Sequence, residues 1–229
     1  MTGVHIQNIA RATTGMFRNR RRPPIVVDAG HDLFASTNRI PDIARIVAAM
    51  LAQPDRVFQV TTLRPGRART LLRNNHFWSC IESFTAPIDD ATIVADNCVH
   101  RIVPNLQLGV AADTQAPTIT RLALLLDTPV STRFLDARPL RGPLDLRSFL
   151  DTQPQLDGTG RRNSSLDWVM AAARADHPND AELQWVRAIR DQCVDAGIPF
   201  RFDGWGHSAN RLLDGKLWDQ YPRQVEVIL

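Results

Sequence analysis

The stretch Phe58-Gln59-Val60-Thr61-Thr62-Leu63-Arg64-Pro65 decides the fold class of this chain. A run of apolar and β-branched residues that stops at a proline is typical of a buried strand, and we expect this strand to span Val57 to Thr62. The preceding residues, Ile40 to Ala52, carry large apolar side chains at helical spacing. The residues that follow, Ala68 to Arg73, predict a second helix. The stretch is therefore expected to be one strand between two helices.

The same alternation of strand and helix recurs along the rest of the chain. Strands that are apolar throughout and are separated by helices predict a parallel sheet. We therefore expect an α/β fold: a single partial (β/α) barrel of about six parallel strands or, as the alternative, an open doubly wound parallel sheet. Residues 91–103 are either helical or irregular, and 151–165 predicts a surface loop. The other expected strands are 24–28, 106–110, 132–136, 166–170 and 198–202, and the other expected helices are 116–126 and 181–196.

The composition is that of an ordinary globular protein. Of the 229 residues, 44% are apolar and 22% are charged, so the chain can bury a sizeable core. No apolar run approaches the roughly 18 residues that are needed to span a bilayer. The N-terminus also lacks the apolar segment of a signal peptide. We expect a cytoplasmic protein.

One dense basic run lies near the N-terminus, and it consists of arginine. Lys216 is the only lysine, so the other 26 of the 27 basic residues are arginines. We expect residues 1–22 to form a flexible basic segment. A single domain is expected to follow at 23–229. A basic arm can bind nucleic acid through its phosphates, whereas a solvated surface run is the alternative. The candidate residues for nucleic-acid binding are Arg18, Arg20, Arg21 and Arg22.

The three cysteines, Cys80, Cys98 and Cys193, are widely separated in the sequence. An odd number of cysteines without close pairs is typical of neither a disulfide framework nor a zinc site. We therefore expect isolated thiols in a reducing compartment.

Several segments occur in a recognisable order: 31–34, 58–65, 105–115, 128–146, 166–169, 185–206 and 213–219. In that order and spacing they resemble a phage- and prophage-associated family of radical-SAM-like proteins, most of unknown function. The resemblance covers most of residues 25–220 and implies a radical-SAM-like barrel. In that family, three cysteines in a CxxxCxxC-like arrangement near the N-terminus hold a [4Fe–4S] cluster. Residues 1–22 of this chain contain no cysteine.

The resemblance also implies that the polar residues of the family's pocket have been exchanged. The family usually has lysine at Leu63 and Asp203, glutamate at Asp113, Arg138 and Arg174, and a glycine pair at Ala172-Ala173. Alanine methyl groups obstruct the close approach of a ligand that a glycine pair permits. Arginine in place of glutamate inverts a charge. We therefore expect no iron–sulfur cluster, no S-adenosylmethionine and no other cofactor.

Charged residues gather at the expected carboxyl ends of the strands, where folds of this class place their function. Three alternatives stay open: a divalent-metal site for hydrolysis, a structural ion-pair network in which the two exchanged arginines meet Asp136 and Asp203, or an anion site. We favour the anion site, built from Arg64, Arg138 and Arg174, and expect no metal. His31-Asp32 resembles a scaffold pair of the family. The candidates are Arg64, Asp113, Asp136, Arg138, Arg174, Asp203 and His207, with Asp28, His31 and Asp32 as secondary candidates.

The expected function is that of a cluster-free, non-radical descendant of this family. It would be a binding or regulatory protein in the host cytoplasm, linked to phage nucleic-acid modification or to host takeover. One alternative is a repurposed enzyme that acts on an anionic substrate at the rim of the barrel. Another is a nucleic-acid-binding protein that uses the basic arm. The expected partners are an anionic small molecule, a host or phage protein, or nucleic acid, and not a membrane.

Overall fold

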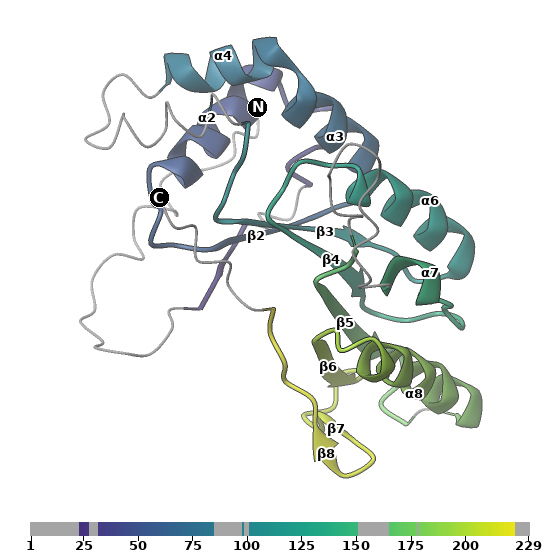
Figure 1. Ribbon diagram of the computed structural model, residues 1–229. Coiled ribbons are helices and arrows are strands. Elements are labelled where there is room, and N and C mark those ends of the chain that lie inside the picture. Colours follow the sequence, from purple (N-terminus) through teal and green to yellow (C-terminus); the bar gives the residue numbers. More distant parts are fainter. Residues whose placement is uncertain are drawn as a thin grey trace, which may run out of the picture.

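Figure 1 presents the computed structural model, in which helices follow the outer side of a curved sheet. The structure describes residues 23–27, 32–84, 98, 101–150, 165–177 and 179–222. The sheet has six strands in the order β1-β2-β3-β4-β5-β6, and every neighbouring pair is parallel. The strands are β1 (Ile25–Val26), β2 (Phe58–Thr62), β3 (Leu106–Ala111), β4 (Thr132–Ala137), β5 (Trp168–Ala173) and β6 (Phe200–Trp205).

Strands that are neighbours in the sheet are also neighbours in the chain. The order therefore never reverses, as it would in a doubly wound sheet. Connections of one hand then place the helices on one side and curl the sheet into a half-barrel, which confirms the expected α/β fold. The helices are α2 (Ile40–Leu51), α3 (Pro65–Arg73), α4 (Asn75–Ser83), α6 (Gln115–Leu126), α7 (Arg147–Leu150) and α8 (Asp180–Asp195).

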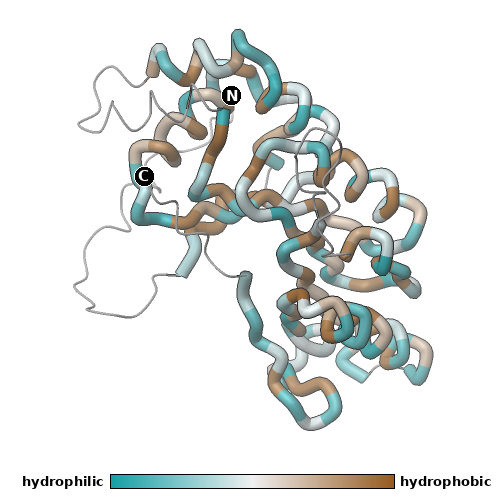
Figure 2. The backbone as a smooth tube through the Cα atoms, in the orientation of Figure 1, coloured by the Kyte–Doolittle hydropathy of each residue, from teal (hydrophilic) through white to brown (hydrophobic). Residues whose placement is uncertain are grey.

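The main core lies between the sheet and these helices. Along β2, Phe58 and Val60 are fully buried in it, and along β6 so are Phe200 and Phe202. The spacing of two residues shows that alternate side chains of each strand face the helices. Apolar residues also recur at helical spacing among polar ones, so that each helix buries one face (Figure 2).

The other face of the sheet, turned away from the helices, has its own small apolar cluster. Phe134, Trp168 and Met170 are at most 1% exposed and pack together there. Phe134 lies opposite Gly109 in the register of β3 and β4. A Cβ atom at Gly109 would lie 2.1 Å from Cε2 of Phe134, so this ring requires a glycine beside it.

Most of the expected elements are confirmed, with several differences at their ends. Helix α3 begins at Pro65, three residues before the expected start, because proline is well suited to the first turn of a helix. Strands β5 and β6 begin two residues later than expected and continue three residues further. The short helix α7 was not expected. Residues 28 and 91–97, together with 151–164, lie outside the described residues.

Helix α4 was missed because residues 74–103 gave no clear periodicity. Its start is nevertheless fixed by a specific cap, since the side chain of Asn74 accepts hydrogen bonds from the backbone N–H groups of His76 and Phe77. Its apolar residues Phe77, Trp78 and Ile81 are buried. The cap and the spacing of these three residues together explain the helix.

A hairpin follows β6 and is held against helix α8. Its strands β7 (Leu212–Leu213) and β8 (Lys216–Leu217) are antiparallel. The turn residues Asp214 and Gly215 both have positive φ angles, of 53° and 74°. The Asp214 carboxylate accepts hydrogen bonds from Arg187 and Arg190 of α8. The hairpin is therefore fixed to the helix by charge as well as by its own pairing.

The residues after the hairpin run beside β6. The Phe202 amide donates to the Trp218 carbonyl at 2.8 Å, and the Gln220 amide donates to the Phe200 carbonyl at 3.3 Å. The Trp168 indole donates to the Gln220 carbonyl at 2.9 Å. In the part of the chain that the structure describes, no helix is both long enough and apolar enough to cross a membrane.

Candidate functional site

Arg138 is the centre of a charged cluster on the sheet face that is turned away from the helices. Its guanidinium group binds both carboxylate oxygens of Asp136, with Nε–Oδ1 and Nη2–Oδ2 distances of 2.6 and 2.8 Å. The same guanidinium group also pairs with Asp203. Asp136 lies in β4 and Asp203 in β6. Arg138 therefore joins two strands that are separated by β5.

The cluster continues outward from Asp203 through two more arginines. Arg201 binds Asp203 at 2.5 Å and lies 3.6 Å from Asp219. Arg211 lies 3.5 Å from Asp203 and 3.3 Å from Asp219. Three arginines thus meet three aspartates, and the formal charge of the cluster is zero. Its members are Asp136, Arg138, Arg201, Asp203, Arg211 and Asp219, which we call the rim network.

Burial of the Arg138 guanidinium group works to lower its pKa, because a charged group is less well solvated there. The hydrogen bonds and the negative charges of Asp136 and Asp203 outweigh that effect and raise the pKa of Arg138 above its usual value. Arg138 is therefore a fixed cation at any physiological pH. Its donors are directed at carboxylates of the protein itself.

The other predicted residues at the strand ends do not join the rim network. Asp113 forms its own ion pair with Arg141, at 3.1 Å. Arg174 is exposed and, within the described residues, has no ion pair. His207 is exposed too, and its backbone N–H donates to the carboxylate of Asp176. The ion-pair alternative, in which both exchanged arginines meet Asp136 and Asp203, therefore applies to Arg138 alone.

Asp32 has a structural position, as its resemblance to a scaffold pair implies. Its carboxylate accepts hydrogen bonds from the Thr62 hydroxyl at 2.7 Å, the Leu63 amide at 2.8 Å and the Phe34 amide at 2.9 Å. It thus fastens the segment before α2 to the end of β2. The remaining predicted residues lie outside the described part of the chain. They are Asp28, His31, Arg18, Arg20, Arg21 and Arg22.

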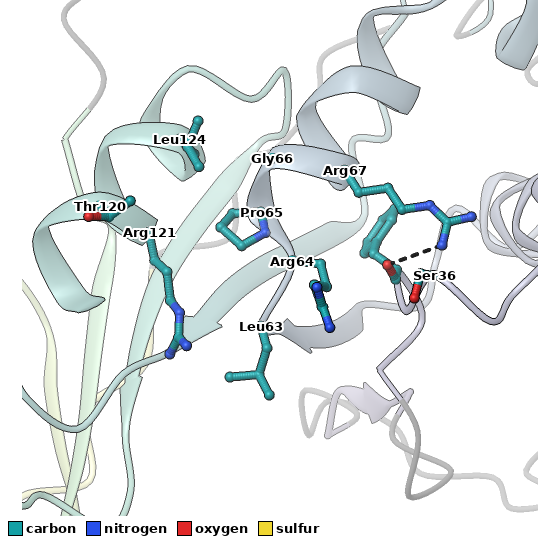
Figure 3. A pocket seen from close by; sticks show the side chains of 10 residues that line it. Ser36, Leu63, Arg64, Pro65, Gly66, Arg67, Thr120, Arg121 and Leu124 are labelled. Carbon is teal, nitrogen blue, oxygen red and sulfur yellow. Dashed lines mark hydrogen bonds between the residues drawn. The ribbon is translucent and has the colours of Figure 1, made fainter.

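A cavity of about 410 Å³ opens beside the carboxyl end of β2, between α3 and α6 (Figure 3). Three arginines line it: Arg64 directly after β2, Arg67 in α3 and Arg121 in α6. Figure 3 shows Arg64 and Arg121 on the two sides of Leu63. Leu63, directly after β2, is 53% exposed. We call this cavity the β2 pocket.

Backbone carbonyls hold two of these arginines in place. Arg67 donates to the carbonyls of Phe34, Ala35 and Asn38, the last at 2.7 Å. Arg121 donates through Nη1 to the carbonyl of Ala111. Within the described residues, none of the three arginines of the β2 pocket forms an ion pair with a carboxylate. Among those residues, their charges are therefore not compensated as those of the rim network are.

Sequence reasoning missed Arg67 and Arg121, and it missed Arg201 and Arg211 of the rim network. A signal existed for Arg201, because it stands two residues before Asp203 and so shares its face of β6. No such signal existed for Arg121. In a chain with 26 arginines and one lysine, a single arginine on a helix carries little information.

The three cysteines do not form a ligand set for an iron–sulfur cluster. Cys80 lies on α4, whereas Cys193 is buried in α8, which packs against β5 and β6. Burial raises the pKa of Cys193 to about 12, and burial together with the charge of Glu82 raises that of Cys98 to about 11. Among the described residues, no three histidine, cysteine or acidic side chains are grouped as metal ligands. Cys80 and Cys193, on separate helices, are therefore not grouped as ligands of one cluster.

Comparison with known proteins places the chain in a family. No curated protein matches it, and neither does any solved structure. The model of one family, described as "Protein of unknown function (DUF5131)", matches residues 4–222. That match covers the whole sheet, the rim network and the β2 pocket. The chain therefore belongs to the DUF5131 family of proteins of unknown function.

Proposed function

We propose that this protein is a cluster-free, non-radical relative of the radical-SAM-like phage proteins, and that it acts by binding an anionic ligand. The observation that carries the proposal is the contrast between two groups of arginines at the strand ends. The arginines of the rim network face carboxylates in equal number. The arginines of the β2 pocket face a cavity without a carboxylate partner in the described residues. Uncompensated guanidinium groups around a cavity favour anion binding.

The paired charges of the rim network favour a structural role for its aspartates over a catalytic one. A general base needs a lone pair that can accept a proton from a substrate. Asp136 is bound on both oxygens by Arg138, and Asp203 is bound by Arg138 and Arg201. These two aspartates face the inner side of the half-barrel, where an enzyme of this fold class would place reactive groups. Their engagement favours a structural role for them.

The link to phages follows from the resemblance of the sequence segments alone. On that basis the protein would serve phage nucleic-acid modification or the takeover of a host pathway, as a regulatory partner. A half-barrel with paired charges inside and an open arginine-lined cavity at its edge suits such a role, because the cavity offers a place for a ligand. In this role the protein would act by binding an anion.

Two experiments on the full-length protein test the two parts of the proposal. Anaerobic incubation with iron and sulfide, followed by metal analysis, should leave the chain without a stable cluster, and S-adenosylmethionine should not be cleaved. Thermal unfolding with inorganic phosphate, phosphate esters and carboxylates should show at least one anion that raises the midpoint in proportion to its occupancy. A brown protein with about four irons per chain would contradict the first part. Turnover of the bound anion, or no response to any anion, would contradict the second.

A further inference from the structure

We infer that the β2 pocket binds a phosphate monoester with an apolar organic portion, with Arg64 and Arg121 as its ligands. This inference rests on the proposed function, since it names the site and the class of the anion. The cavity volume of about 410 Å³ lies at the lower end of the range for small-molecule sites, which is about 300–1,000 Å³. The pocket therefore suits a small phosphorylated compound.

The charge of the pocket matches a phosphate ester. Three arginines contribute three positive charges, and the Asp32 carboxylate, which accepts from the Leu63 amide at the edge of the pocket, contributes one negative charge. Among the described residues these charges sum to about +2, which a phosphate monoester near pH 7, with a charge of about −1.5 to −2, would balance. A carboxylate, with one negative charge, would leave the pocket with an excess of positive charge. Phosphate is therefore the better match.

Two of the three arginines that line the pocket keep side-chain N–H donors that no described residue uses. A guanidinium group has five N–H donors. The donors of Arg67 are mostly used by three carbonyls, so this residue contributes its charge. Arg121 uses only Nη1 for the Ala111 carbonyl, which also fixes its orientation. Arg64 has no hydrogen-bond partner for its side chain within the described residues. Arg64 and Arg121 thus supply the free N–H groups.

The lining between these two arginines is apolar. Leu63, Pro65 and Leu124 all line the cavity, and Leu63 stands between Arg64 and Arg121 (Figure 3). Inorganic phosphate would leave this apolar surface in water. An ester with an aromatic or aliphatic group would cover it and gain the free energy of burying apolar area. The lining therefore selects an organic phosphate over the free ion.

The test uses calorimetric titration of the full-length protein with phenyl phosphate and inorganic phosphate. Phenyl phosphate should bind about tenfold more tightly than inorganic phosphate, a difference of about 1.4 kcal/mol. Arg64→Gln and Arg121→Gln should each weaken phenyl phosphate binding at least about tenfold. Leu63→Ala should weaken phenyl phosphate but not inorganic phosphate. The matched control is Arg174→Gln, which, like Arg64→Gln, removes an exposed positive charge at the same end of the sheet but outside the pocket.

Each outcome decides between the pocket and the broader proposal. Binding that survives both Arg64→Gln and Arg121→Gln but is lost in Arg174→Gln would overturn the pocket and keep an anion-binding function. Equal affinity for the two probes would overturn the organic portion of the ligand. If neither probe binds while another anion raises the unfolding midpoint, the phosphate class is wrong. Because Arg121 also supports Ala111, Arg64→Gln keeps the test valid if Arg121→Gln fails to fold.

Discussion

The guanidinium group of Arg138 reaches across strand β5 to pair with Asp203 on strand β6. Arg138 follows β4, so this ion pair connects two strands that share no backbone hydrogen bonds. The Arg138 and Asp203 side chains are 31% and 18% exposed, which places the pair between a surface and a buried salt bridge. Its contribution to stability should therefore exceed that of an exposed pair.

A double-mutant cycle measures this contribution. We expect Arg138→Gln and Asp203→Asn to show a coupling free energy of about 1–2 kcal/mol in chemical unfolding, because the pair is partly shielded from water. The Arg147–Asp145 pair, with side chains 77% and 54% exposed, is the control, and its coupling should be clearly smaller because water screens it. Coupling energies of equal size in the two cycles would show that Arg138 does not join the strands energetically.

Acid should loosen the attachment of the β7–β8 hairpin to α8. Hydrogen bonds from Arg187 and Arg190 lower the pKa of Asp214 to about 2. A carboxyl group whose pKa is lowered in the folded state contributes stability above its unfolded pKa, which is near 4. That stability is lost as the pH falls through about 2. Carboxyl NMR titration should therefore place Asp214 well below ordinary aspartates, and Arg187→Gln should raise its pKa.

The effect of this group on stability is measured by comparison with Asp214→Asn. Asparagine tolerates the positive φ angle of this position, so the substitution removes the charge and keeps the turn. The stability advantage of the natural protein over the variant should grow between pH 2 and pH 5 and then level off. An advantage that is constant over this range would mean that Asp214 titrates normally.

The three thiols should differ sharply in reactivity. Burial raises the pKa values of Cys98 and Cys193 to about 11 and about 12, so at pH 8 only about one thiol in 1,000 or fewer is the reactive thiolate at either position. Cys80 is half-buried on α4. Iodoacetamide should modify one cysteine per native chain, at Cys80, and all three after denaturation. Peptide mapping identifies the site, and rapid native labelling of Cys193 would contradict the packing of α8.

Gly109→Ala should destabilise the protein by about 1–3 kcal/mol, the usual range for overpacking a core. The new methyl group would meet the ring of Phe134, which is fully buried and packs against Trp168 with ring centroids 5.6 Å apart. Gly142→Ala is the control, because its nearest contact is Thr114 Cγ2 at 3.8 Å. Phe134→Leu in the Gly109→Ala background should recover part of the loss in thermal unfolding. Equal effects of the two glycine substitutions would refute the close contact.

The sequence predicted the strands and helices whose residues are strongly apolar. Helices α2 and α8 start and end within one residue of their expected positions, because periodic burial of one face dictates them. Strand β5 continues three residues beyond its expected end, because those residues are alanines, which have low strand propensity. The β7–β8 hairpin was not predicted, although Asp214-Gly215 is a typical two-residue turn. This turn was therefore a usable signal for the hairpin.

The candidate site was predictable only as a set of charges at one end of the sheet. Pairing of Arg138 with Asp136 follows from two positions close in sequence, and it was among the open alternatives. The contact of Arg138 with Asp203 depends on the order and curl of the strands, which no local pattern contains. The β2 pocket depends on the packing of α3 beside α6. The sequence therefore predicted Arg64 as a site residue, but not Arg67 and Arg121, which line the same cavity.

The segment of residues 218–220 beside β6 has a consequence for how the protein behaves at high concentration. A half-barrel, unlike a closed barrel, has open edges whose free N–H and C=O groups invite pairing with other chains. At β6 those groups are occupied by Trp218 and Gln220. The chain thereby shields its own sheet from strand addition, and it does so with residues outside the barrel strands. We expect removal of this segment to expose the β6 edge to pairing with other chains.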